Sequence, residues 1–279
     1  MQEPAAAARV VRALTSDRHI RLSALDASPL WDGVRRGHPQ LEADACAVLV
    51  QHLAGTLLLQ ARTFFSERLQ ILVRTSGRAK AVVSDAWPEG DIRGVLDPVP
   101  GKDGAWLEGP GLVQVMRSTA GAQPYMGNLE WVEGSLAKQF EAYLQQSEQV
   151  QASVDLWCDP ATGEAGGLLV EPMPGCPPDR LQALIDALDG LEVVPLWERT
   201  PDFLCTWINR GPGSEVLGAT DVRYHCRCSR ESLLQALAGF GAERLADMFK
   251  EDLPVDVRCD YCGAEYRVAR ADIPAGGDA

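Results

Sequence analysis

The sequence is short of positive charge, and it lacks any long apolar run. Its 279 residues carry 39 Asp and Glu against 26 Lys and Arg, a formal net charge of −13. A field of that sign repels phosphate backbones and anionic lipid headgroups, so we expect no nucleic-acid partner and no membrane partner. No apolar run approaches the roughly 20 residues that cross a bilayer. Arg9 and Arg12 interrupt the Ala-rich beginning, so we expect no signal peptide and a cytoplasmic protein.

Several catalytic and nucleotide-binding motifs are also missing. There is no Walker A sequence and no GxGxxG after a predicted strand, which argues against a nucleotide site. The absence of His-x-Glu excludes the zinc deaminases. Ser135 and Lys138 match the SxxK string of acyl-serine enzymes, but no KTG or SDN element accompanies them, and a capped helix produces the same string. We therefore expect a protein that is not an enzyme.

What the sequence does contain is typical of a globular protein. Hydrophobic residues make up 46% of the chain and charged residues 23%, and the length predicts about two domains. Strands and helices follow one another without regular βαβ alternation, which predicts the α+β class. The periodicities predict helices over residues 41–62 and 135–148, and strands over 68–74, 79–84, 111–117, 125–132, 150–158 and 165–171.

The domain organisation is predicted from a proline-dense stretch at residues 172–178. We assign residues 1–174 to an α+β core domain and 175–220 to a helical linker with a first helix capped by Asp179. A second apolar segment of that linker ends at a break over residues 211–213. The linker is too apolar to be solvated, so we expect it to pack on a neighbour. Residues 221–270 form a small C-terminal domain, and 271–279 form a tail.

Cysteine usage carries the chemistry. Four of the eight cysteines form two tight pairs near the C-terminus, the CxC pair Cys226 and Cys228 and the CxxC pair Cys259 and Cys262. Four thiolates complete a tetrahedral zinc shell, which leaves no open position for water or substrate and argues against a zinc enzyme. His225 adjoins the first pair and is an alternative ligand. The scattered thiols are expected to be inert: Cys46, Cys158, Cys176 and Cys205.

Two readings of this zinc site remain open from the residues alone. In the first, the zinc is permanently structural, as in most all-cysteine sites. In the second, it holds the thiolates ready for oxidation, with nearby arginines favouring the thiolate form. A domain of this size has little other stabilisation, so we expect metal loss to unfold it.

The sequence resembles the heat-shock protein 33 family of redox-regulated holdase chaperones. The resemblance covers roughly residues 40–270 and is strongest at the two cysteine pairs and their spacing. Further motifs that carry it are Glu67-Arg68-Leu69-Gln70, Asp91-Ile92-Arg93-Gly94, Gly134-Ser135-Leu136-Ala137, Ser147-Glu148-Gln149 and residues 166–174.

The resemblance implies an α+β core, a metastable helical linker and a C-terminal zinc redox switch. It implies one Zn²⁺ per chain in the reduced form, held by Cys226, Cys228, Cys259 and Cys262. Oxidation would release the zinc and form the disulfides Cys226–Cys228 and Cys259–Cys262. The implied activity is ATP-independent binding of unfolding proteins, by an oxidised homodimer and with no nucleotide.

Four apolar linker residues are our candidates for client binding: Trp197, Phe203, Leu204 and Trp207. We expect them to be covered in the reduced protein and exposed after oxidation. The competing hypothesis is a constitutive protein-interaction adaptor that contains a zinc ribbon with a purely structural zinc. Suppression of client aggregation only after oxidation separates the two.

Overall fold

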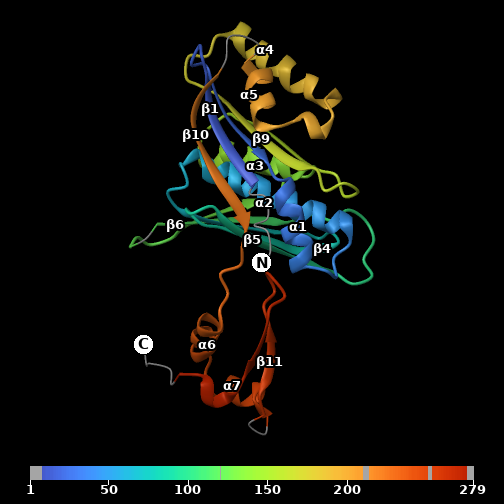
Figure 1. Cartoon of the computed structure of the whole chain (residues 1–279), viewed down its shortest axis with the longest axis vertical. Helices are drawn as coiled ribbons and strands as arrows, with labels where there is room; N and C mark the ends of the chain where they lie inside the picture. Colours follow the sequence, from blue (N-terminus) through green and yellow to red (C-terminus); the bar gives the residue numbers. More distant parts are fainter. Residues whose placement is uncertain (1–7, 120, 210–213, 251–252, 275–279) are drawn as a thin grey trace, which may run out of the picture. The chain divides into compact units, whose positions relative to one another are not determined.

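The computed structural model describes residues 8–119, 121–209, 214–250 and 253–274 (Figure 1). The expected break over residues 211–213 and the end of the tail, 275–279, lie outside these ranges. The chain divides into two compact units, Met1–His225 and Cys226–Ala279. This division leaves the three-part assignment of core, linker and switch as a prediction, because the linker helices fall within the first unit.

The first unit is built on one ten-stranded sheet with the order β7-β6-β3-β4-β5-β10-β1-β2-β9-β8. Neighbouring strands are antiparallel except for β5 and β10, which are parallel. The strands are β1 (Ala8–Thr15), β2 (Ile20–Asp26), β3 (Arg68–Arg74), β4 (Ala79–Ala86), β5 (Asp91–Pro98), β6 (Leu112–Ser118), β7 (Tyr125–Glu130), β8 (Ser153–Cys158), β9 (Ala165–Pro172) and β10 (Ser214–Tyr224). Helices in the same unit confirm the α+β class.

The main core surrounds the helix α2 (Ala43–Arg62). Figure 1 shows α2, α1 (Ser28–Gly37) and α3 (Leu136–Ser147) between β1, β9 and β10 on one side and β4, β5 and β6 on the other. Within the described ranges, α2 has the length and apolar composition of a membrane span, but 78% of that window is buried inside the protein. Gly55 is needed there, because a Cβ at this position would lie 2.0 Å from the ring of Phe140.

The opposite face of β1, β2 and β9 carries a second core, formed with the linker helices. Alternating residues of one strand divide between the two cores: Val10 of β1 belongs to the first, and Val11 and Ala13 belong to the second. The covering elements are α4 (Pro178–Asp189), η1 (Gly190–Val193), η2 (Leu196–Glu198) and α5 (Pro201–Asn209). The expected cap at Asp179 is wrong, since α4 begins at Pro178 and Asp179 lies in its first turn.

The second unit is small. It contains α6 (Arg230–Ala238), α7 (Ala242–Met248), a hairpin of β11 (Val255–Arg258) and β12 (Glu265–Val268), and η4 (Arg270–Asp272). Among its described residues, the buried apolar cluster consists of Leu237, Leu245, Phe249, Val268 and Ile273. A cluster of this size supplies little burial free energy, so the unit needs another source of stability.

Candidate metal centre and the linker face

The four paired cysteines come together at one point of the second unit. Cys226 and Cys228 precede α6, and Cys259 and Cys262 lie between β11 and β12. Their Sγ atoms all lie within 4.8 Å of one another, with 3.8 Å between Cys226 and Cys259 and 3.4 Å between Cys228 and Cys262. A Zn–S bond of about 2.3 Å gives a tetrahedron with edges of ~3.8 Å, so the group fits a four-thiolate zinc ion. His225, weighed above as a substitute ligand, is not among these four clustered residues.

A tight turn shapes the CxxC arm. The amide of Gly263 donates to the carbonyl of Cys259 at 2.8 Å, and the amide of Cys259 donates to the carbonyl of Ala264 at 2.8 Å. Gly263 has a φ of 73°, in the left-handed region that favours glycine. The turn also directs the amides of Tyr261 and Cys262 at the Cys259 sulfur. Such bonds stabilise a thiolate and orient it as a ligand.

The CxC arm is held by the beginning of α6. Ser229 caps the helix: its Oγ accepts a bond from the amide of Ser232 at 3.1 Å, and the Oγ of Ser232 accepts one from the amide of Ser229 at 3.0 Å. Arg230 pairs with Asp272 at 2.6 Å, and Asp272 accepts the amide of Ala269 at 2.8 Å. These contacts tie the beginning of α6 to the segment that follows β12, and so hold the two cysteine arms near each other.

The thiols of the cluster differ in their acidity. Burial raises the pKa of Cys259 and of Cys262. Burial also acts to raise the pKa of Cys228, but hydrogen bonds from Tyr266 and from neighbouring cluster thiols outweigh it, and the pKa of Cys228 is lowered. A bound zinc ion would supply the positive charge that keeps all four sulfurs in the thiolate form.

The four thiols outside the cluster are set apart by their surroundings. Cys46, Cys158 and Cys205 are buried. Burial raises the pKa of Cys158 to about 12 and that of Cys205 to about 11, and it raises the pKa of Cys46 as well. Cys176 is half-buried, with a raised pKa. Thiols in this state are weak nucleophiles, as expected for inert cysteines.

The linker residues proposed for client contact are covered to different degrees. Leu204 is fully buried, and the half-buried rings of Phe203 and Trp207 stack with centroids 5.4 Å apart. The indole of Trp207 donates to the carbonyl of Ala187 at 2.7 Å and so joins α5 to α4. Trp197 is 66% exposed, so the expectation that all four are covered is wrong for this residue. It lies in the short η2 turn, which presents the ring to solvent.

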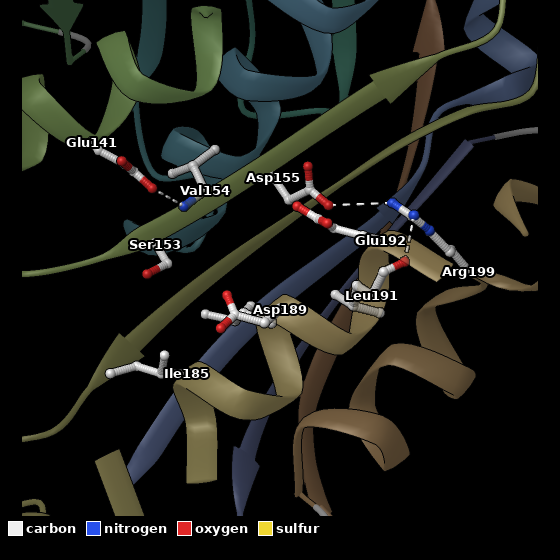
Figure 2. Close-up of a pocket in the computed structure, with 10 residues that line it drawn as sticks. Glu141, Ser153, Val154, Asp155, Ile185, Asp189, Leu191, Glu192 and Arg199 are labelled. Atoms are coloured by element: carbon white, nitrogen blue, oxygen red, sulfur yellow. Dashed lines mark hydrogen bonds and ion pairs between the residues drawn. The ribbon is translucent and has the colours of Figure 1, made fainter. Parts of the chain in front are cut away.

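Arg199 fastens the linker to β8. Its guanidinium donates to the carbonyls of Leu191 at 2.6 Å and Val194 at 3.0 Å, and it pairs with the Asp155 carboxylate at 3.3 Å. It also lies over the ring of Trp157, 5.2 Å from the centroid. Figure 2 shows Arg199 reaching across to Asp155 and Leu191. The residue therefore contacts both the linker backbone and the sheet beneath.

The pocket beside Arg199 is acidic (Figure 2). It has a volume of about 400 Å³ between β8 and the linker, and Glu141, Asp155, Asp189 and Glu192 line it. Burial raises the pKa of Asp155. The negative charge of Glu192 raises this pKa further, while the positive charge of Arg199 lowers it. Arg199 thus offsets repulsion among carboxylates at the place where the linker docks.

Arg199 and Tyr266 are contact residues that sequence reasoning missed. The partner of Arg199 lies on β8, 44 residues earlier in the chain, so no local pattern indicates it. Tyr266 follows Cys262 by four residues and lies in β12, and its Oη lies 3.1 Å from the Sγ of Cys228. The alternation of that strand is the one signal that points its side chain toward the cysteines.

The chain is similar to known proteins over nearly all its length. It matches the profile of the family described as Hsp33 protein over residues 8–269. A protein named 33 kDa chaperonin from Lactobacillus delbrueckii subsp. bulgaricus is 29% identical over 95% of this chain and 96% of its own length. Another of the same name, from Symbiobacterium thermophilum, is 29% identical over 95% of each chain. The crystal structure of the 33 kDa chaperonin from Thermotoga maritima superimposes with a TM-score of 0.80 at 21% identity, covering 96% of this chain and 97% of that one.

Proposed function

Because the chain belongs to the Hsp33 protein family, we propose that it is an ATP-independent holdase chaperone that is switched on by oxidation of its cysteine cluster. Chaperone function follows from the family, whose relatives bear the name 33 kDa chaperonin. The observation that supports redox control is the gathering of four thiols within 4.8 Å on a unit with a small core. Because zinc binds only the folded arrangement, metal loss and unfolding of this unit are thermodynamically linked.

The oxidation step needs two equivalents of a peroxide. A cluster thiolate attacks one peroxide oxygen, and the O–O bond breaks. The other oxygen departs as hydroxide, and the sulfur becomes a sulfenic acid. A second thiolate attacks that sulfur, and hydroxide departs as the S–S bond forms. Two such reactions convert four thiolates and two hydrogen peroxide molecules into two disulfides and four hydroxides. Every metal ligand is then consumed, and the zinc ion departs.

The pairing of the disulfides rests on the family resemblance, which implies Cys226–Cys228 and Cys259–Cys262. The short contacts of 3.8 Å and 3.4 Å instead join one arm to the other. Tetrahedral ligands are about equally far apart, so distances of this size fit a zinc tetrahedron and do not select a pair. Peptide mapping of the oxidised protein assigns the bonds.

Release of the linker is the step that exposes an apolar surface. The sheet face beneath α4 and α5 is lined by Val11, Ile20, Leu22, Leu168 and Val170, among other buried residues. This face and the linker residues Trp197, Phe203, Leu204 and Trp207 are the proposed client-binding surface. Large exposed apolar patches are typical of protein-binding sites. A homodimer after oxidation, a cytoplasmic location and independence from nucleotides belong to the same proposal.

The test follows aggregation of a heat-labile client enzyme by light scattering. The full chain is compared as reduced, zinc-loaded protein and after peroxide treatment, with Cys176→Ser as the control that removes a thiol outside the cluster. We expect protection only after oxidation, and equally in wild type and Cys176→Ser. Equal protection by the reduced protein would contradict redox control, and no protection in either state would favour the constitutive adaptor.

A further inference from the structure

We propose that Tyr266 is a positioning residue for the Cys228 thiolate, and that its hydroxyl sets how tightly the cluster holds zinc and how fast it is oxidised. The Oη of Tyr266 lies 3.1 Å from the Sγ of Cys228. A thiolate ligand has no proton to give, so in the zinc-loaded cluster the tyrosine hydroxyl is the donor. The inference deepens the proposed function and rests on zinc binding by these four cysteines.

The hairpin places Tyr266 where it joins the two cysteine arms. In the β11–β12 register Tyr266 pairs with Val257, two residues before Cys259. Its ring is half-buried and packs against the small apolar cluster of this unit, which fixes the direction of the hydroxyl. The CxxC sulfur of Cys259 receives donors from its own turn, whereas the donor to Cys228 comes from a strand on the opposite arm.

Cys228 is also a sulfur that a small oxidant can approach. A cavity of about 160 Å³ lies beside the cluster, with Cys228, Cys259, Leu233, Val257 and Tyr266 among its lining residues. This space admits a molecule of the size of hydrogen peroxide, so the rate of attack depends on the nucleophilicity of the sulfur. The Tyr266 hydroxyl therefore acts on a reachable atom.

A hydrogen bond from outside the ligand shell acts on both metal binding and reactivity. It withdraws electron density from the sulfur and holds it at its coordination position, and loss of such a partner typically weakens metal binding 10–100-fold. Thiolate nucleophilicity follows basicity with a slope of about 0.4–0.5, so a tenfold change in basicity alters the attack rate about threefold. Without the Tyr266 hydroxyl, we expect the Cys228 sulfur to bind the metal more weakly and to be a better nucleophile.

The experiment compares the full-length reduced, zinc-loaded wild type with Tyr266→Phe and with Tyr125→Phe, which removes the hydroxyl of a tyrosine that is 57% exposed on β7. Zinc affinity is measured by chelator competition without oxidant, and zinc release by a metallochromic dye in excess hydrogen peroxide. For Tyr266→Phe we expect about tenfold weaker zinc binding and at least threefold faster release. Tyr125→Phe matches wild type in both.

Cobalt substitution separates the hydrogen bond from a packing effect. In cobalt-loaded Tyr266→Phe we expect the thiolate-to-cobalt charge-transfer band to shift to lower energy while the d–d bands, which report tetrahedral geometry, stay in place. In wild type carrying 3-fluorotyrosine at position 266, a stronger donor of nearly the same shape, we expect slower zinc release. This second variant keeps the test open if Tyr266→Phe does not fold.

Unchanged affinity, release rate and charge-transfer energy in Tyr266→Phe would overturn the inference, as would unchanged release from the fluorotyrosine protein. A wild type that keeps its zinc in peroxide would instead contradict the proposed function. In that case the chelator and cobalt measurements still decide the role of Tyr266, because neither depends on oxidation.

Discussion

The two compact units differ in where their stability comes from. In the first unit, α2 is buried between two parts of a ten-stranded sheet, and a second apolar core lies beneath the linker. In the second unit, the described residues bury one small cluster around Leu237 and Phe249. The first is stabilised by packing, which oxidants do not attack, and the second by four sulfur ligands, which they do. A chain built in this way can lose the fold of the second unit and the docking of the linker on oxidation, and keep the main core around α2.

The largest effect is expected from zinc removal, which should unfold the second unit and leave the main core of the first unit folded. Structural zinc typically supplies about 10–16 kcal/mol in small zinc-binding peptides, far more than the small cluster contributes. A chelator should therefore abolish hydrogen-exchange protection in β11, β12 and α6, while α2 stays protected. Protection of the hairpin that persists after the metal is gone would show that packing alone holds this unit together.

Acid should weaken the first unit through His52. This residue is fully buried on α2, and its Nε2 lies 3.2 Å from the carbonyl of Ile71 and 3.1 Å from the hydroxyl of Ser84. Burial lowers its pKa from 6.5 to about 4. The unfolded chain then takes up a proton at higher pH than the folded chain, so stability present above pH 6.5 is lost as the pH falls toward 4.

The expected loss is about 3 kcal/mol in the free energy of unfolding of the first unit, from the size of the pKa shift. Denaturant unfolding at neutral and acidic pH measures it, and His52→Gln should remove most of this dependence. His19→Gln serves as a control, since His19 is half-buried outside the two cores. If His52→Gln loses as much stability in acid as wild type does, another group is responsible.

A substitution at Arg199 should weaken the docking of the linker on the first unit and leave the cysteine cluster of the second unit intact. Arg199→Met should leave the Asp155 carboxylate without its guanidinium and the carbonyls of Leu191 and Val194 without the Arg199 donor, although the Leu191 carbonyl keeps the amide of Val194 at 3.0 Å. Because the Arg199 side chain is 9% exposed, we expect a cost of about 2–3 kcal/mol to linker docking. Faster hydrogen exchange in α4 and α5 of the zinc-loaded protein measures the change.

Arg9→Met is the matched control for that variant, because Arg9 and its partner Asp221 are both largely exposed and such pairs contribute little. Zinc affinity should be unchanged in both variants. Wild-type protection of α4 and α5 in Arg199→Met would mean that apolar packing alone holds the linker down.

The smallest effect is expected when a helix-capping serine is replaced in each of the two units. Ser229 caps α6 beside Cys228, and Ser135 caps α3 in the first unit. Replacement of either by Ala costs about 1 kcal/mol, and in the second unit that loss appears as roughly fivefold weaker zinc binding. Ser135→Ala should lower the stability of the first unit with no change in zinc affinity. Equal zinc affinities in the two variants would contradict the coupling of folding to metal binding.

The fold was predictable from sequence where burial imposes a pattern. The strands at 68–74 and 165–171 and the helix at 41–62 were found because their apolar residues recur at strand or helix spacing. β1, β2, β5 and β10 were missed. β10 is mostly exposed along its length, and its partner β1 lies some two hundred residues earlier, so neither local alternation nor a short turn marks the pair.

The four cysteines of the site were predictable from their spacing in the sequence. Cys226, Cys228, Cys259 and Cys262 were grouped because pairs of thiols at short spacing are typical of zinc sites, and their Sγ atoms do gather. The contacts that orient these cysteines were not predictable, since the approach of Tyr266 to Cys228 depends on the register of the hairpin. Trp197 shows the same limit, because its apolar side chain predicts burial and only the backbone of η2 turns it to solvent.

A peroxide titration tests whether oxidation of the cysteine cluster releases both the zinc and the linker. Increasing peroxide is added to the reduced, zinc-loaded chain, and zinc release, hydrogen exchange in α4 and α5, and protection of a heat-labile client are measured on each sample. We expect all three to rise together as two peroxides per chain are consumed, while the amides of α2 stay protected from hydrogen exchange. Full client protection before any zinc is released, or complete zinc release with the linker still docked and the client aggregating, would contradict this expectation.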